Sequence, residues 1–180
     1  MKTVTVVFWL ALAACRTGGA DALSPPGTKM ESLAVTSRSF PSNGEIPVDY
    51  TCDGADRSPQ ITWSAPPPGT KSFAVMAEDP DAASGTFTHW IVYNISADTR
   101  ALPEAVDPAT LGGSSGLNDF KRPGYGGPCP PQLEIHHYAF RVFALNAQLG
   151  GGPEPNRDAI DAAMSGHVLA AGVLVGSFSH

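Results

Sequence analysis

Two aspartates and a histidine lie close together in residues 77–90, AEDPDAASGTFTHW. Asp79 and Asp81 flank a proline, and His89 follows eight residues after Asp81. Holding two carboxylates together costs free energy, because each disfavours the charged form of the other. Taken alone, Asp-Pro-Asp is typical of a turn, since Asp accepts hydrogen bonds from nearby backbone N–H groups and Pro fixes φ. The alternative is a site in which the carboxylates hold or orient a histidine.

A second segment whose residue types could form a binding site covers residues 125–138, YGGPCPPQLEIHHY. Gly126 and Gly127 permit close approach of the backbone to a ligand and are expected to point N–H groups at it. Pro131 is the last of three prolines that fix the adjoining wall of such a site. This segment therefore predicts a binding surface downstream of the aspartates.

The end of the second segment enters an aromatic, β-branched run that predicts a strand. Successive residues of a strand face opposite sides, so His136 and Tyr138 share one face and His137 points to the other. A single histidine such as His136 is more commonly a hydrogen-bonded core residue than a ligand. It becomes a site candidate only together with Asp79, Asp81 and His89.

The elements that position these residues read mainly as short strands. The chain has 180 residues, which suits one domain, and its 19 Gly, 17 Pro and 16% charged residues favour strands and turns over helix bundles. A run that is apolar on both faces, residues 71–77, predicts a strand covered on both sides. The expected fold is a mainly β, antiparallel sandwich with one or two peripheral helices. The predicted strands are residues 33–36, 60–63, 71–77, 90–95, 137–145 and 168–178, with a helix at 156–165 and a long irregular stretch at 96–134.

The N-terminus predicts export. Residues 1–14 form a short apolar stretch after one lysine, as in a signal peptide, and they end in Leu-Ala-Ala before Cys15. This run resembles the bacterial lipobox, in which cleavage precedes a cysteine that carries lipid; a plain signal peptide is the alternative. We expect residues 15–30 to be a lipidated flexible tether and residues 31–180 to be the folded domain. The protein would then be a membrane-anchored lipoprotein facing the periplasm or the cell exterior.

Export would place Cys52 and Cys129 in an oxidising compartment, where they either form a disulfide or serve as two small buried hydrophobic residues. The net charge of −6, with 11 basic and 17 acidic residues, argues against a nucleic-acid partner. The letters of a catalytic serine elbow occur at residues 112–116, GGSSG, but no strand or helix is expected around them, so a flexible loop is preferred. No cofactor motif is present, and no cofactor is predicted.

Four motifs in order, DPD, TFTHWIVYNI, GGPCPP and HHYAF, resemble the phosphatidylethanolamine-binding protein family, and most of all its bacterial, Raf-kinase-inhibitor-like branch. The resemblance covers nearly all of residues 31–180. It implies a large antiparallel sheet packed on a second sheet, with a small anion-binding cavity at one end. Carried over by motif, that cavity would be lined by Asp79, Asp81, His89, Gly127, Pro131, His136 and Tyr138.

This chain departs from the eukaryotic members at several positions. Phe87 stands where those members often have Trp, Thr88 where they often have His, and His137 where they have Arg. The last strand is followed almost at once by His180, which leaves no room for the C-terminal helix beside the eukaryotic pocket. The kinase-regulating role of those members is therefore not carried over.

The expected function is binding of phosphate or of a phosphoethanolamine-like head group, with no catalytic residue assigned. Either the aspartates hydrogen-bond His89 and His136 and raise their pKa values, so that imidazolium faces the phosphate, or one carboxylate pairs with the ammonium of ethanolamine. The Tyr138 hydroxyl and N–H groups near Gly127 would complete the site. Two alternatives remain: a protein-interaction module that inhibits a protease or kinase through residues 96–134, and a metal-dependent hydrolase that uses the Asp/His cluster.

Overall fold

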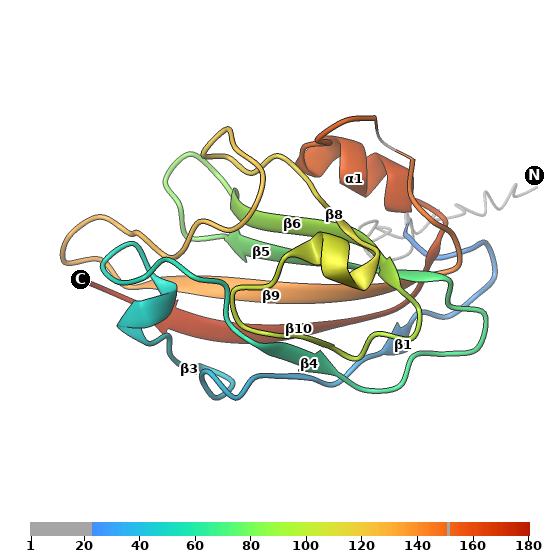
Figure 1. Ribbon diagram of the computed structural model, residues 1–180, viewed down its shortest axis with the longest axis horizontal. Helices are drawn as coiled ribbons and strands as arrows, with labels where there is room; N and C mark the ends of the chain where they lie inside the picture. Colours follow the sequence, from blue (N-terminus) through green and yellow to red (C-terminus); the bar gives the residue numbers. More distant parts are fainter. Residues whose placement is uncertain (1–22, 151) are drawn as a thin grey trace, which may run out of the picture.

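The fold is a β-sandwich with one α-helix, seen in a computed structural model that describes residues 23–150 and 152–180 (Figure 1). The expected signal peptide and Cys15 lie outside the described residues. The mainly β class predicted from the sequence is confirmed. In chain order the strands are β1 (Glu31–Ser32), β2 (Val35–Thr36), β3 (Gly44–Glu45), β4 (Ile61–Trp63), β5 (Ser72–Asp79), β6 (Phe87–Ser96), β7 (Ala101–Leu102), β8 (Ser114–Ser115), β9 (His136–Leu145) and β10 (Val168–Phe178), with α1 at Arg157–Met164 and 3₁₀ turns at Val48–Tyr50 and Pro108–Leu111.

The central sheet has the strand order β1-β10-β9-β5-β6-β8, and β3 also pairs with β10. The long strands β5, β6, β9 and β10 pair antiparallel, whereas the short β1 and β3 run parallel to β10. A smaller antiparallel sheet has the order β2-β4-β7. Residues that are far apart in sequence therefore meet at the ends of the central strands.

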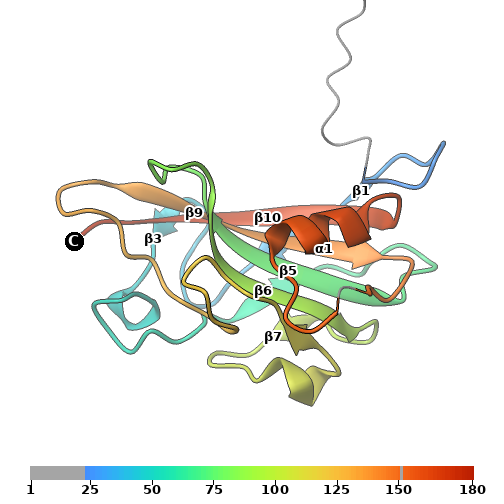
Figure 2. The same cartoon turned by 90° about the horizontal axis from the view of Figure 1, so that it is seen from above.

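Strand β5 is buried along its whole length because both of its faces are covered. Phe73 and Val75 point into the core between the two sheets, with Trp63 of β4. Ala74 and Met76 belong to a second cluster, which includes Ile160 of α1 and the adjoining β strands. In Figure 2, α1 lies over the face of the central sheet that carries this second cluster. The sequence prediction of a strand covered on both sides is confirmed.

The predicted helix is also confirmed, because its capping residues act locally. The Asn156 side-chain oxygen accepts a hydrogen bond from the Ala159 N–H at 3.1 Å, which satisfies a free donor of the first turn. Helix α1 covers Arg157–Met164, and Gly166 follows with φ of +75°, a conformation that glycine adopts without strain.

Two predictions about local structure are wrong. The strand expected at residues 33–36 is only Val35–Thr36, because the Leu33 N–H donates instead to Ala171 of β10 at 2.8 Å. The GGSSG segment is not a free loop: Ser114 and Ser115 form β8, which pairs with Tyr93 and Val92 of β6. The serine elbow still lacks its strand–turn–helix setting.

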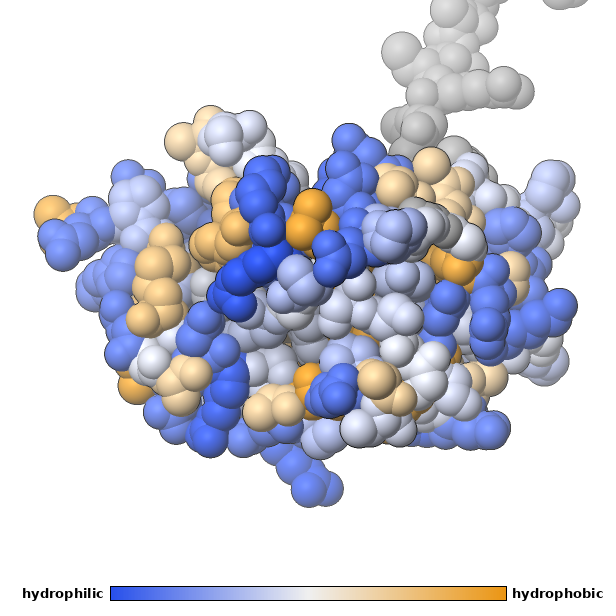
Figure 3. All heavy atoms as spheres, turned by 45° about the horizontal axis from the view of Figure 1, so that its top comes forward, coloured by the Kyte–Doolittle hydropathy of each residue, from blue (hydrophilic) through white to orange (hydrophobic). Residues whose placement is uncertain are grey.

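Residues 23–30, which the sequence placed in the tether, contact the folded domain. The Val168 N–H donates to the Leu23 carbonyl at 2.8 Å, and Leu23 and Met30 pack against the second core cluster. On the face shown in Figure 3, hydrophobic (orange) surface occurs in small areas separated by hydrophilic (blue) surface. Within the described part of the chain, no helix has the length and apolarity needed to cross a membrane.

Cys52 and Cys129 form a disulfide with a Cα–Cα distance of 5.5 Å. The bond joins segments 77 residues apart. The Cys52 N–H also donates to the Pro128 carbonyl at 3.1 Å, so the two segments are held by the backbone as well. The disulfide fixes the proline-containing segment 128–131 against the body of the domain.

Candidate anion-binding site

A cavity of about 300 Å³ lies at the end of the central sheet where β5 ends and β6 and β9 begin. In Figure 1 this end of the sheet is at the left, near the C-terminus. Asp79 is the last residue of β5, His89 lies near the start of β6, and His136 is the first residue of β9. The cavity is lined by Asp79, Ala82, Ala83, Phe87, His89, Phe120, Cys129, Pro130, Pro131, Glu134 and His136.

His136 lies between two carboxylates. Its Nδ1 is 2.7 Å from Oδ2 of Asp79 and its Nε2 is 3.1 Å from Oε2 of Glu134. The imidazole and the Asp79 carboxylate are both buried, whereas the Glu134 side chain is 59% exposed. Burial lowers the pKa of His136, but the hydrogen bonds to Asp79 and Glu134 outweigh burial, and the net shift is upward. Because a carboxylate oxygen lies within hydrogen-bond distance of each ring nitrogen, the geometry favours the imidazolium form of His136, in which Nδ1–H and Nε2–H both donate.

Asp79 serves the turn and the site at once. Its Oδ1 accepts the Asp81 N–H at 2.9 Å, the turn geometry that the Asp-Pro-Asp run favours, while its Oδ2 accepts from His136. Both interpretations of the motif therefore apply to the same carboxylate. The peptide bond from Asp79 to Pro80 is trans.

His89 is held by the backbone rather than by an aspartate. Its Nδ1 is 2.8 Å from the Gly126 carbonyl, which fixes the tautomer with the proton on Nδ1. Burial lowers the pKa of His89, so the ring is neutral near physiological pH and Nε2 is a hydrogen-bond acceptor. The expectation of a raised pKa is wrong for His89: burial outweighs the hydrogen bond to the Gly126 carbonyl and the charge of Asp79, both of which raise the pKa. Edge-on contacts with Phe87 and Phe120 hold the ring from the sides.

Asp81 turns away from the cavity. Its Oδ2 accepts both the backbone N–H and the Nδ1–H of His137 at 2.8 Å. The hydrogen bond to the His137 side chain, followed by that to its backbone, lowers the pKa of Asp81. Asp81 thus braces the start of β9, and the sequence prediction that it shares the pocket with Asp79 is not met by its position.

The two glycines shape the wall without offering N–H groups to a ligand. The Gly127 N–H donates to Oδ1 of Asp56 at 2.6 Å, and the Gly126 N–H donates to the His89 carbonyl at 3.1 Å. A Cβ on Gly127 would lie 2.4 Å from the Tyr50 carbonyl oxygen, so glycine is needed there for close packing. The expected cradle of N–H groups near Gly127 is therefore absent, whereas Pro131 lines the cavity as predicted.

Tyr138 lies next to the site with its ring buried. The ring meets that of His89 edge to face, with centroids 5.3 Å apart. Burial and then the charge of Asp79 raise the pKa of Tyr138, so the hydroxyl keeps its proton. That hydroxyl has no hydrogen-bond partner at normal geometry among the described residues, although the Cys129 backbone and Asp79 are near enough to affect its pKa. Tyr138 is not among the residues that line the cavity.

Sequence reasoning missed two important lining residues, Glu134 and Phe120. Glu134 lies two residues before His136, so the period-2 alternation of an extended segment was a usable signal for it. Phe120 carries no local signal, because the long loop brings it to the cavity. The Asn118 side chain donates to the Gly124 carbonyl at 3.0 Å, and Asp119 exchanges backbone and side-chain hydrogen bonds with Thr88 of β6.

Two hydrophobic residues next to Glu134 in the chain are exposed to solvent. The Leu133 side chain is 95% exposed and has φ of +70°, and Ile135 is 67% exposed. They lie on either side of Glu134 in the chain. Of these three consecutive residues, only Glu134 lines the cavity.

The ligand atoms expected for a metal site do not converge. Among the described residues, the one group of three candidate ligands within 4.8 Å of one another is Cys52, Cys129 and His180. The disulfide engages both of those sulfurs. Asp79 and His136 instead bind each other directly, which leaves the arrangement suited to hydrogen bonding rather than to chelation.

Comparison with known proteins identifies a family and several relatives of this chain. The family profile described as "Phosphatidylethanolamine-binding protein" matches residues 36–179. A "UPF0098 protein" of Aquifex aeolicus is 48% identical over 150 residues, which are 81% of this chain and 88% of that protein. A Mycobacterium tuberculosis protein named "Putative lipoprotein LppC" is 33% identical over 195 residues, covering 99% of this chain and 94% of that one.

A solved structure provides the same match in three dimensions. The crystal structure of Escherichia coli YbcL, described as a member of the mammalian PEBP family, superimposes with a TM-score of 0.77 at 31% identity. It covers 83% of this chain and 99% of YbcL. The match spans the central sheet and the ordered motifs together, and this chain belongs to the phosphatidylethanolamine-binding protein family.

Proposed function

We propose that the cavity binds a small phosphate-bearing molecule through protonated His136. One observation carries this proposal: a buried histidine with a raised pKa directs Nε2–H to an exposed carboxylate at the mouth of a cavity. Glu134 occupies the position where a phosphate oxygen would accept the same hydrogen bond. Charge-assisted hydrogen bonds of this kind are short and roughly twice as strong as neutral ones.

The two carboxylates beside His136 have different parts in this proposal. Asp79 is buried and holds Nδ1, so it stays in place and keeps the imidazolium charged. Glu134 is 59% exposed, so it can swing into solvent when a phosphate arrives without leaving a buried charge unpaired. The neutral His89 Nε2 would then accept a hydrogen bond from a protonated phosphate oxygen.

The displaced Glu134 carboxylate would lie beside the bound phosphate. A carboxylate in that position favours an ammonium group on the ligand and disfavours a second anionic group. The pocket would then select a zwitterion, such as phosphoethanolamine, over inorganic phosphate. This is the head group that the family description names, and the chemistry of Glu134 and His136 supports it independently of that name.

Isothermal titration calorimetry with the full chain carrying Cys15→Ala tests this proposal without detergent. Phosphoethanolamine, inorganic phosphate and ethanolamine would be titrated separately at about pH 6, where an imidazolium with a raised pKa is charged. We expect phosphoethanolamine to bind more tightly than phosphate, and ethanolamine to bind more weakly than both. An absence of binding by both phosphate compounds would refute the proposal.

We further propose that residues 1–14 are a signal peptide, that Cys15 is lipidated and that residues 15–30 link the anchor to the domain. The small residues before Cys15 support this, as does the name of the mycobacterial relative that aligns over 99% of this chain. Two or more acyl chains would hold the protein firmly at a membrane surface. Cys15→Ala is expected to move the protein from the membrane fraction to the soluble fraction, whereas Cys15→Ala protein that still sediments with membranes would rule out this anchor.

A further inference from the structure

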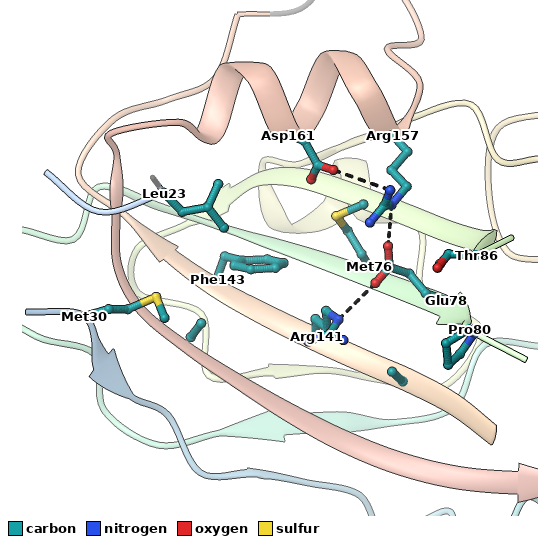
Figure 4. Close-up of a pocket in the computed structure, with 12 residues that line it drawn as sticks. Leu23, Met30, Met76, Glu78, Pro80, Thr86, Arg141, Phe143, Arg157 and Asp161 are labelled. Atoms are coloured by element: carbon teal, nitrogen blue, oxygen red, sulfur yellow. Dashed lines mark hydrogen bonds and ion pairs between the residues drawn. The ribbon is translucent and has the colours of Figure 1, made fainter. Parts of the chain in front are cut away.

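A second, larger cavity of about 500 Å³ lies on the opposite face of the central sheet (Figure 4). Adjacent residues of a strand face opposite sides, so Glu78 of β5 points into this cavity while Asp79 points into the anion pocket. The sheet itself separates the two sites. The phosphate chemistry of His136 does not involve this second cavity, although Pro80, Thr86 and Ala139 of the family motifs contribute to its wall.

One end of the cavity is apolar. Leu23 and Met30, from the N-terminal segment, face Phe143 of β9, and Met76 of β5 lies toward the middle (Figure 4). These side chains come from segments that are far apart in the sequence. Volumes of about 300–1,000 Å³ with mainly apolar walls and a few placed polar groups are typical of small-molecule sites.

The other end is charged. The buried Glu78 carboxylate lies between two arginines, with Oε2 at 3.0 Å from Nε of Arg141 and Oε1 at 2.6 Å from Nε of Arg157 (Figure 4). Asp161 is 3.7 Å from Nη1 of Arg157. Each arginine therefore donates its Nε–H to Glu78, which fixes the direction of the guanidinium plane.

The two terminal nitrogens of Arg141, Nη1 and Nη2, are available to donate hydrogen bonds to a ligand. Within residues 23–150 and 152–180, Nη1 and Nη2 of Arg141 make no hydrogen bond; the Arg141 side chain lines the cavity and is 47% exposed. Arginine presents these N–H groups as a fork that matches a carboxylate in two parallel hydrogen bonds. Glu78 and Asp161 together balance the charges of Arg141 and Arg157, so this end of the cavity offers a ligand the free N–H groups of Arg141 rather than a net positive charge.

Stability alone does not account for the Arg141–Glu78–Arg157 group. A buried ion pair is often no more stabilising than well-packed hydrophobic side chains of similar size, because desolvation offsets the attraction. Here the charged group stands at the end of an apolar cavity, where hydrophobic residues would close the space. An oriented guanidinium at the end of an open apolar volume has the form of a receptor for an amphipathic anion.

We propose that this cavity binds a fatty-acid-type carboxylate. The alkyl chain lies between Met76, Phe143 and the N-terminal residues Leu23 and Met30. The carboxylate accepts two hydrogen bonds from Nη1 and Nη2 of Arg141, while Glu78 holds that guanidinium in place. The site is independent of the anion pocket on the other face of the sheet.

Calorimetric titration of the full chain carrying Cys15→Ala with dodecanoate tests this inference, with acetate and 1-dodecanol as partial ligands. We expect dodecanoate to bind, acetate not to bind, and dodecanol to bind about tenfold more weakly than dodecanoate, as expected for loss of a charge-assisted pair. Arg141→Gln is expected to weaken dodecanoate binding about tenfold or more and to leave dodecanol binding unchanged. Ala171→Leu, which fills the cavity wall, is expected to weaken both ligands.

Two control variants show whether dodecanoate binds at this cavity or elsewhere on the protein. Arg38→Gln removes an exposed arginine from another part of the surface, and His136→Gln alters the anion pocket; both are expected to leave dodecanoate affinity unchanged. Thermal unfolding of each variant, with and without dodecanoate, shows whether a variant has lost binding or has lost its fold. The proposal is overturned if dodecanoate does not bind, if Arg141→Gln and Ala171→Leu bind it as tightly as the parent chain, or if His136→Gln abolishes binding.

Discussion

Replacing His136 by glutamine is expected to weaken phosphate binding about tenfold to a hundredfold at about pH 6, because a hydrogen bond to a charged group is worth about 1.5–3 kcal/mol. Glutamine is close to histidine in reach and keeps an N–H donor, but it carries no charge. The change also leaves the Asp79 carboxylate, which is buried, without its cation. Calorimetric titration with phosphate measures the loss of affinity.

His137→Gln is the matched control for this change. His137 is the adjacent residue, is also bonded to an aspartate, and points to the other side of β9 with a side chain 60% exposed. We expect its phosphate affinity to match that of the parent chain. Equal losses in the two variants would mean that the start of β9, rather than the His136 imidazolium, governs binding. Circular dichroism and thermal unfolding establish that both variants remain folded.

Glu134→Gln is expected to strengthen phosphate binding about threefold to tenfold, a modest gain because the Glu134 side chain is largely exposed to solvent. The carboxylate competes with phosphate for Nε2–H of His136 and repels it when displaced. Its loss also removes one of the hydrogen bonds that raise the pKa of His136, so the gain is expected at about pH 6 and should shrink as pH rises. Titrations at about pH 6 and about pH 8 separate the two effects.

The same variant tests the zwitterion selectivity. Without the Glu134 carboxylate, the advantage of phosphoethanolamine over phosphate should shrink toward equality. Glu31→Gln removes the same charge from the exposed edge strand β1, which pairs near the other end of β10, and should change neither affinity. If Glu134→Gln weakens phosphate binding instead, Glu134 is not a competitor of the ligand.

The fold was predictable where its determinants are local. The two-sided apolar run of β5, the capping role of Asn156 and the alternation of His136 and His137 all follow from short-range periodicity and chain geometry. The strand at residues 33–36 was shortened by a long-range hydrogen bond, from Leu33 to Ala171, that no local pattern encodes.

The sequence predicted several residues that line the cavity, but not the hydrogen-bond partners of their side chains. Motif order brings Asp79, His89 and His136 to one cavity. Which carboxylate contacts which imidazole depends on where β5 ends and β9 begins. In this pairing of the two strands, Asp81 hydrogen-bonds His137 and does not contribute to the pocket. His89 hydrogen-bonds the Gly126 carbonyl because the long loop folds back onto β6. The residues next to His89 in the sequence do not indicate this contact.

The most direct test of anion binding by protonated His136 is the pH dependence of affinity for sulfate, whose charge stays constant across the range. Because the pKa of His136 is raised, its imidazolium persists below that pKa and is lost as pH rises through it. Calorimetry between about pH 5 and about pH 9 should therefore show sulfate affinity falling with pH, with no comparable fall in His136→Gln. A sulfate affinity that is independent of pH, or that rises with it, would contradict binding through the His136 imidazolium.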